Sequence, residues 1–261
     1  MNLRIDGRNA LVCGASQGIG RALAIQFALM GGNVTIVARN AENLESVCNE
    51  LYNSGSQNHD FVAADFTEPK EAIKEIAAQV VKKPIHILVN NTGGPPPGEL
   101  YKADSMELEL AFRRQVVMSQ MLVHLTVEGM KSENFGRIIN IISIGLKQPI
   151  PGLGISNTIR GAVGSWAKTI SRELAPFGIT VNNILPGYTK TSRLESLFES
   201  RAKSAGKTPE QMEAETVSQI PAGRLAMPEE LGYLAGFLVS DKAAYITGTS
   251  IPIDGGFLSC L

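Results

Sequence analysis

The sequence predicts a single α/β domain built on one parallel sheet with helices on both faces. Short β-branched runs alternate with longer helical patterns from end to end, which is typical of parallel strands joined by crossover helices. No linker or internal repeat divides the 261 residues, and the 44 % hydrophobic content is enough for one large core. We therefore expect one domain over residues 1–261.

Seven runs rich in Val and Ile predict the strands of this sheet. In chain order they cover residues 9–13, 33–38, 60–64, 85–90, 137–143, 180–185 and 250–253. In the fifth run, isoleucines at positions 138, 139, 141 and 142 do not alternate with polar residues. This pattern is typical of a central strand covered on both faces, so the sheet is expected to be doubly wound.

Glycine and proline mark the ends of the helices between the strands. Gly31 and Gly32 are expected to end the first helix, whereas Pro69 and Pro228 stand where helices begin. Residues 189–221 depart from the pattern because they are polar, helix-prone and inserted between the sixth strand and the last helix. Open α/β sheets bind ligands at the carboxyl ends of their strands, so we expect this insertion to form a substrate lid there.

Charge and apolar patterning argue against several functions. The chain has 24 Lys and Arg against 25 Asp and Glu, so it lacks the positive field that collects nucleic acid. Residues 1–7 are polar, and no apolar run approaches the roughly 18 residues of a membrane span. Cys13, Cys48 and Cys260 show no paired or metal-ligand spacing. We expect a soluble cytoplasmic protein with free thiols, no metal, and neither nucleic acid nor membrane as partner.

A glycine-rich turn follows the first predicted strand directly and opens a helix. Glycines at this place let the backbone approach a pyrophosphate at the positive N-terminus of the helix, as in Rossmann-type dinucleotide-binding folds. The sequence therefore predicts a dinucleotide site at this turn. The residues expected to contribute to it are Gly14, Ser16, Gln17, Gly18, Ile19 and Gly20.

The end of the second predicted strand indicates which dinucleotide binds. An NAD-dependent dehydrogenase would place a carboxylate there for the ribose hydroxyls, whereas this chain has Arg39 and no acid. An arginine suits a 2′-phosphate, so NADP(H) is favoured over NAD(H), with a solvated surface arginine as the alternative. Asp65 and Phe66, after the third strand, are expected beside the adenine, although Asp65 would also suit a helix cap.

The order of these motifs resembles the short-chain dehydrogenase/reductase family over essentially the whole chain, most closely its 3-oxoacyl-ACP-reductase-like members. The matching motifs are Gly14, Gly18 and Gly20 in TGxxxGxG, with Cys13 for Thr; Asn90-Asn91-Thr92-Gly93 in NNAG; Pro186-Gly187 with Thr191 in PGxxxT; and Ile246-Thr247-Gly248 with Asp254-Gly255-Gly256 in ITG and DGG. The resemblance implies cofactor contacts from Asn91, Gly93, Pro186, Gly187 and Thr191, and a homotetramer.

The family's chemistry resides in an Asn, a Ser and a YxxxK pair, and here the chain departs from the family. Ser143 fills the serine position, although a serine at the end of a strand is often only a helix or turn cap. The family spacing then places Ser156 at the tyrosine and Arg160 at the lysine. Arg160 is also expected to clamp the nicotinamide ribose, with pairing to a nearby carboxylate as the alternative. The asparagine position falls at Gln115. The resemblance thus implies an atypical catalytic set of Ser143, Ser156, Arg160 and Gln115.

These substitutions predict an altered proton delivery. The family's tyrosine protonates the oxygen of the reduced carbonyl, whereas serine is a far weaker acid and arginine keeps its charge. General acid catalysis, worth about 10²–10⁴-fold, is therefore impaired, while hydride positioning is a separate contribution. Tyr188 is expected at the nicotinamide end, either as a substrate contact and substitute acid or packed under the lid. Pro95, in a stiff proline loop, is expected to border the substrate.

Two classes of function follow from this reading. The first is an NADP(H)-dependent oxidoreductase that acts on a small carbonyl compound or secondary alcohol, with 3-oxoacyl-thioester reduction as one candidate reaction. The second is a catalytically silent dinucleotide-binding sensor, or an inactive subunit of a mixed oligomer, which the substitutions at Gln115, Ser156 and Arg160 favour.

Overall fold

The computed structural model describes residues 2–80 and 83–260, and within these residues seven strands form one sheet. The strand order is β3-β2-β1-β4-β5-β6-β7, and every neighbouring pair is parallel. The strands are β1 (Asn9–Cys13), β2 (Asn33–Ala38), β3 (Asp60–Ala63), β4 (Ile87–Asn90), β5 (Gly136–Ile141), β6 (Ile179–Pro186) and β7 (Ser250–Ile253). The predicted doubly wound parallel sheet is confirmed.

The strand ends differ from the predicted ones by up to two residues. The largest shifts are at β4, which begins at Ile87 rather than at residue 85, and at β5, which ends at Ile141 rather than at residue 143. Ile142 still donates its N–H to the Ile184 carbonyl at 2.9 Å, but Ser143 already caps a short 3₁₀ turn. Apolar composition therefore extends past the point where the chain leaves the sheet.

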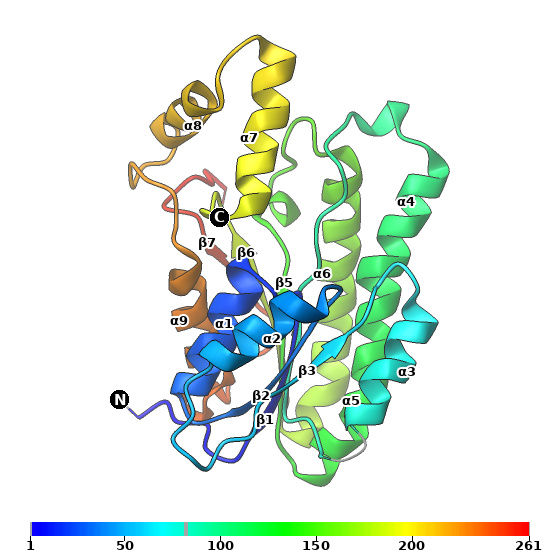
Figure 1. Cartoon of the computed structure of the whole chain (residues 1–261). Coiled ribbons are helices and arrows are strands. Elements are labelled where there is room, and N and C mark those ends of the chain that lie inside the picture. Colours follow the sequence, from blue (N-terminus) through cyan, green and yellow to red (C-terminus); the bar gives the residue numbers. More distant parts are fainter. Residues whose placement is uncertain (1, 81–82, 261) are drawn as a thin grey trace.

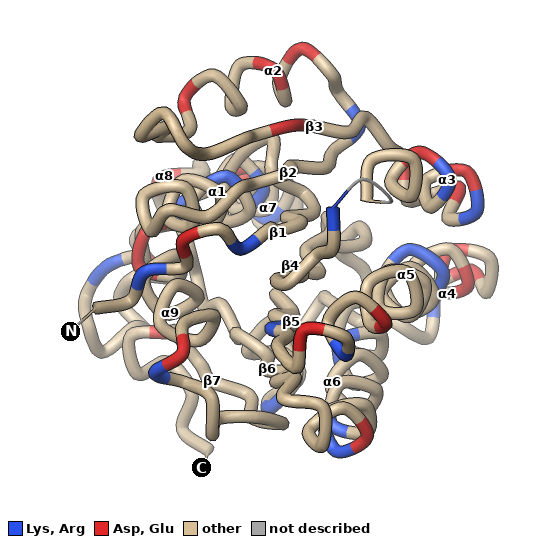
Figure 2. The backbone as a smooth tube through the Cα atoms, turned by 90° about the horizontal axis from the view of Figure 1, so that it is seen from below, with Lys and Arg blue, Asp and Glu red and all other residues tan. Residues whose placement is uncertain are grey.

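Helices cover both faces of the sheet (Figures 1 and 2). Side chains of α1, α2 and α9 pack in one apolar core, and those of α3, α5 and α6 pack in the other. The helices are α1 (Gly18–Leu29), α2 (Ala41–Glu50), α3 (Pro69–Val80), α4 (Ser105–Phe112), α5 (Met118–Ser132), α6 (Gly154–Leu174), α7 (Ser192–Ala205), α8 (Pro209–Ser218) and α9 (Pro228–Val239). Both prolines predicted to begin helices do so, at Pro69 and Pro228.

The end of α1 shows why glycine is needed there. Gly31 has a φ of +93°, and a β-carbon on it would lie 2.2 Å from an Asp6 carboxylate oxygen. Its N–H donates to the Ala28 carbonyl at 3.0 Å, which closes the helix and directs the chain into β2.

A row of buried amides crosses the sheet from β4 to β7. Asn90 donates to Asn140 at 2.8 Å, Asn140 donates to Asn183 at 2.9 Å, and Asn183 donates to the Ser250 hydroxyl at 3.0 Å. Because buried polar groups are costly when unpaired, this row fixes the register of four strands next to the loops that follow them.

The predicted insertion consists of two helices, α7 and α8, joined by a short turn. Figure 1 shows both beyond the carboxyl ends of the strands, the edge of the sheet at which the turn after β1 also lies. None of the described helices combines the length and the apolarity needed to cross a bilayer.

Candidate active site

A cavity of about 780 Å³ lies at the carboxyl ends of the strands, within the range of roughly 300–1,000 Å³ typical of small-molecule sites. Its walls come from the turn after β1, the ends of β2 and β3, the loop after β4, the end of β5, helix α6, and the segment from β6 into α7. The predicted site residues that line it are Gly14, Ser16, Gln17, Gly18, Ile19, Arg39, Asp65, Phe66, Asn91, Gly93, Pro95, Ser143, Ser156, Arg160, Pro186, Gly187, Tyr188 and Thr191.

Two of the predicted site residues, Gly20 and Gln115, are not among the lining residues. A β-carbon on Gly20 would lie 2.2 Å from the Gly14 carbonyl oxygen, so this glycine lets α1 pack against the turn. Gln115 lies in a π-helical turn, Arg113–Val117, and is 3 % exposed. Its buried Oε1 has no hydrogen-bond partner within the described residues. Such turns are frequent at functional sites, and the catalytic role of Gln115 stays a prediction.

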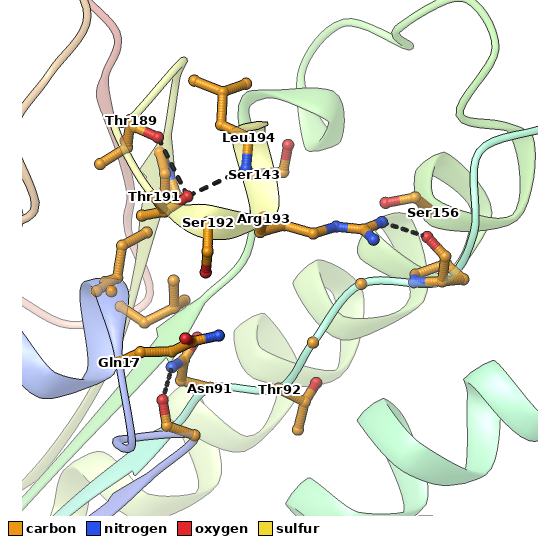
Figure 3. A pocket seen from close by; sticks show the side chains of 18 of the residues that line it. Gln17, Asn91, Thr92, Ser143, Ser156, Thr189, Thr191, Ser192, Arg193 and Leu194 are labelled. Atoms are coloured by element: carbon orange, nitrogen blue, oxygen red, sulfur yellow. Dashed lines mark hydrogen bonds between the residues drawn. The ribbon is translucent and has the colours of Figure 1, made fainter. Parts of the chain in front are cut away.

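The glycine-rich turn is fixed to the loop after β4. Gly14 has a φ of +61°, and a β-carbon on it would lie 2.6 Å from the Asn91 carbonyl oxygen. The Asn91 side chain donates to the carbonyls of Cys13 and Gly14, at 3.2 and 3.1 Å (Figure 3). These contacts fix the conformation of the turn, and the close approach of Asn91 is possible only with glycine at position 14.

The N-terminus of α1 suits an anion. The first N–H groups of a helix have no partner within the helix and carry its positive dipole end. Gln17, the N-cap of α1, makes no side-chain capping bond, and the first turn holds no acidic residue. Gly18, with a φ of +57°, leaves this end open to the cavity. This cradle fits a pyrophosphate.

The ends of β2 and β3 lie at the same end of the cavity. Arg39 is exposed and forms no ion pair within residues 2–80 and 83–260. Asp65 accepts the Thr67 N–H at 3.0 Å through one carboxylate oxygen, which closes a turn before α3. Because α3 begins only at Pro69, Asp65 does not act as the helix cap named as its alternative. The residue lines the cavity together with Phe66.

Two serines lie on the opposite side, at the end of β5 and in α6. Ser143 Oγ accepts the Gly145 N–H at 3.0 Å, so it caps the 3₁₀ turn that follows. A hydroxyl that accepts a hydrogen bond still has its own proton to donate. Ser156 stands one helical turn before Arg160 on α6, and both side chains line the cavity.

Arg160 is held against the sheet by one hydrogen bond. Its Nη1 donates to the Ile141 carbonyl at 3.0 Å, while its buried Nε has no partner in the part of the chain that the structure describes. Burial, assisted by the positive charge of Arg193, lowers the pKa of Arg160 to about 10. The guanidinium is therefore incompletely solvated and incompletely paired.

Arg193 extends from the beginning of α7 across the cavity toward Ser156 (Figure 3). Its Nη2 donates to the Pro95 carbonyl at 2.6 Å, which ties α7 to the proline loop after β4. The hydroxyl of Thr191 caps the same helix, because it accepts the Leu194 N–H at 3.3 Å. It also donates to the Thr189 carbonyl at 3.2 Å.

Sequence reasoning missed three arginines that line the cavity, namely Arg114, Arg193 and Arg201. Arg193 carried a signal, because it lies in the first turn of a helix, where a cation opposes the helix dipole. Arg114 stands beside Gln115 in the π-helical turn, and its buried Nε has no partner among the described residues. Nothing in the local sequence distinguishes Arg201 from a surface arginine.

Tyr188 lines the cavity, and its ring packs edge-on against Phe257 with 5.3 Å between the ring centroids.

In residues 2–80 and 83–260, no group of three or more His, Cys, Asp or Glu side chains is arranged to hold a metal ion. Burial raises the pKa of the Cys13 thiol to about 12, so this cysteine stays protonated and unreactive.

The chain is similar to known proteins over nearly its whole length. Residues 14–258 match the family model adh_short_C2, described as Enoyl-(Acyl carrier protein) reductase. NADPH-dependent reductase BacG of Bacillus subtilis is 31 % identical over 97 % of this chain and 99 % of its own. The 3-oxoacyl-[acyl-carrier-protein] reductase FabG of Pseudomonas aeruginosa is 30 % identical over 97 % of this chain and 98 % of its own.

Among solved structures, L-sorbose reductase from Gluconobacter frateurii, complexed with NADPH and L-sorbose, superposes with a TM-score of 0.93. The two chains are 29 % identical, and the match covers 100 % of each. With its parallel sheet, its glycine-rich turn and a family match over nearly its whole length, the chain belongs to the short-chain dehydrogenase/reductase family of oxidoreductases.

Proposed function

We propose that the protein is an NADP(H)-dependent oxidoreductase that interconverts a carbonyl compound and a secondary alcohol, with proton delivery that does not use a tyrosine. One observation carries the proposal: a single cavity joins the glycine-rich turn and Arg39 to Ser143, Ser156 and Arg160. The relatives named above support NADP(H), because BacG is named as NADPH-dependent and the sorbose reductase structure is described as an NADPH complex.

The cofactor's phosphates would lie at two places in this cavity. The first turn of α1, beginning at Gly18, would hold the pyrophosphate, and Arg39 would pair with the 2′-phosphate. Asp65 and Phe66 would border the adenine. Pro186, Gly187 and Thr191 would position the nicotinamide, which supplies or accepts the hydride when bound. Residues 189–221 would act as the lid over this end.

The proton step would depend on the two serines and Arg160. Ser143 would donate its hydrogen bond to the substrate oxygen, and the positive charge of Arg160 would stabilise that oxygen as it becomes an alkoxide. Ser156 would pass a proton from solvent, because a serine hydroxyl is too weak an acid to supply one by itself. This route would be slower than protonation by a phenol, since it lacks part of the roughly 10²–10⁴-fold rate enhancement typical of general acid catalysis.

A second function deserves a test because Gln115, Ser156 and Arg160 all depart from the family's pattern. The protein would then bind the dinucleotide without turnover, as a sensor or as the inactive subunit of a mixed oligomer. We also propose, from the family resemblance alone, that the chain forms a homotetramer, which sedimentation velocity would test.

The experiment is a calorimetric titration with NADPH and with NADH, followed on the same sample by nicotinamide absorbance with a panel of carbonyl compounds. Tighter binding of NADPH and slow, carbonyl-dependent oxidation would support the oxidoreductase. Binding without turnover by any member of the panel would favour the silent binding protein. Failure to bind either dinucleotide would refute both functions.

A further inference from the structure

The charge of the cavity differs from the charge of the whole chain. The chain has a formal net charge of −1, yet the charged side chains among the described lining residues are five arginines and one aspartate. These are Arg39, Arg114, Arg160, Arg193, Arg201 and Asp65. None of the five arginines forms an ion pair within the part of the chain that the structure describes. The cavity therefore attracts anions although the protein as a whole does not.

The proposed dinucleotide would place a phosphate beside Arg39. The nicotinamide ribose expected beside Arg160 carries no charge, so the dinucleotide would leave the positive charges of Arg160 and Arg193 unbalanced. Both guanidinium groups lie beside the loop after β4. A β-carbon on Gly94 would be 3.6 Å from Nη2 of Arg193 and 3.9 Å from Nη2 of Arg160. Two positive groups thus meet in the cavity that Ser143 and Ser156 also line. Figure 3 shows the Arg193 side chain extending toward Ser156.

This arrangement opposes ordinary electrostatic preferences in three ways. The two cations repel each other, and Arg193 contributes to the lowered pKa of Arg160. Arg193 also stands in the first turn of α7, at the positive end of the helix dipole. Arg160 has a buried Nε without a partner in the described chain. An anion between the two guanidinium groups would offset their mutual repulsion, balance the positive charge at the N-terminus of α7, and offer an acceptor to Arg160.

Both arginines have donors left for such an anion. A guanidinium has five N–H donors, of which Arg193 gives one to Pro95 and Arg160 gives one to Ile141. The planar fork of arginine matches the two oxygens of a carboxylate, which lysine does not. Because Ser143 and Ser156 line the same cavity as the two arginines, and Arg193 extends toward Ser156, one molecule could carry both the anion and the reacting carbonyl.

Building on the proposed function, we infer that the substrate carries a carboxylate in addition to its carbonyl group, and that Arg193 together with Arg160 binds this carboxylate. The substrate class is then an oxo acid, or a hydroxy acid in the reverse direction. A phosphate monoester offers similar acceptor oxygens, and the experiment separates the two.

The experiment compares oxo acids with their methyl esters, a pair that differs in charge but not in the reacting carbonyl. With NADPH, we expect the protein to reduce the preferred acid with a kcat/KM at least ~10-fold above that of its ester. Arg193→Gln should lower kcat/KM for the acid about 10- to 100-fold further than kcat/KM for the ester, so that the preference for the acid is lost. Arg193→Lys should fall between Arg193→Gln and the unchanged protein.

Equilibrium binding gives a second readout that does not require turnover. With NADP⁺ present, a saturated carboxylic acid and its primary amide are titrated into each protein by calorimetry. The acid should bind more tightly than the amide, and Arg193→Gln should abolish that difference while the NADPH affinity stays within about 2-fold. Arg113→Gln is the matched control. Arg113 forms an exposed ion pair with Glu109 of α4 and does not line the cavity.

Each contrary result has its own meaning. Equal activity toward acid and ester, or equal binding of acid and amide, would overturn the carboxylate assignment. If NADPH still binds in these experiments, the proposed function stands. A preference for phosphorylated ketones over oxo acids would replace the carboxylate by a phosphate. Loss of NADPH affinity in Arg193→Gln would assign this arginine to the cofactor instead. Absence of NADPH binding in the unchanged protein would refute the proposed function itself.

Discussion

The double substitution Ser156→Tyr with Arg160→Lys introduces the acid pair that the family resemblance implies for these positions, and it measures how much kcat is lost without that pair. Position 156 faces the cavity one helical turn before position 160, so a phenol there would lie beside the new ammonium group. A nearby cation lowers the phenol pKa from about 10, which makes it a better acid near neutral pH. The cavity of about 780 Å³ has room for the ring.

The magnitude follows from the step that is restored. General acid catalysis is worth about 10²–10⁴-fold, or roughly 3–5 kcal/mol of activation free energy. Arg160→Lys also gives up the 3.0 Å hydrogen bond to Ile141, and this loss offsets part of the gain. We expect kcat for carbonyl reduction to rise by about 10- to 1,000-fold in the double variant. Neither single variant should reach that value.

The assay follows nicotinamide absorbance at saturating NADPH across a pH series. The double variant should lose activity as pH rises through the phenol pKa, because the ionised phenol cannot donate a proton. The unchanged protein should show no such loss until pH approaches about 10, where Arg160 begins to lose its charge. No gain in kcat, with NADPH affinity and thermal stability unchanged, would show that the cavity does not present a carbonyl at position 156.

Three further substitutions test other parts of the account. Arg39→Ala should weaken NADPH binding by about 10- to 100-fold and leave NADH binding unchanged in calorimetry, and an equal effect on both would contradict the 2′-phosphate assignment. Asn140→Leu leaves a buried donor and a buried acceptor unpaired, so urea unfolding should show a loss of about 2–5 kcal/mol. The ion pair with Arg224 lowers the pKa of Glu230 to about 2, so its stabilising contribution is complete above about pH 4.5 and is lost as pH falls toward 2. Glu230→Gln should flatten the melting temperature over that pH window, and an unchanged slope would assign the acid sensitivity to other carboxylates.

Most of the fold could be predicted from the sequence because its signals are local. Four nearly consecutive isoleucines, three in β5 and Ile142 directly after it, indicate burial on both faces of the sheet. Pro69 and Pro228 suit the first turn of a helix and no later position. Strand ends were less certain, because Ile142 remains apolar and buried after the chain has left the sheet. Composition alone does not distinguish such a residue from the strand before it.

Some residues of the candidate site could likewise be predicted from the sequence, and others could not. Gly14 and Gly18 could be placed from the sequence, because positive φ values and close backbone approach require glycine. Arg193 and Pro95 meet only after α7 has folded over the loop following β4, 98 positions apart in the chain. That contact depends on tertiary structure. Arg193 lies outside the family motifs, so the resemblance did not point to it.

A single-turnover experiment with NADPH deuterated at the transferring position of the nicotinamide tests the central claim most directly. The protein, in excess over the dinucleotide, is mixed with the preferred carbonyl compound of the panel, and the product is analysed by mass spectrometry. We expect an alcohol with one carbon-bound deuterium for each NADPH consumed. Tight NADPH binding with no deuterium in the product of any carbonyl compound would contradict this expectation and leave a dinucleotide-binding protein without turnover.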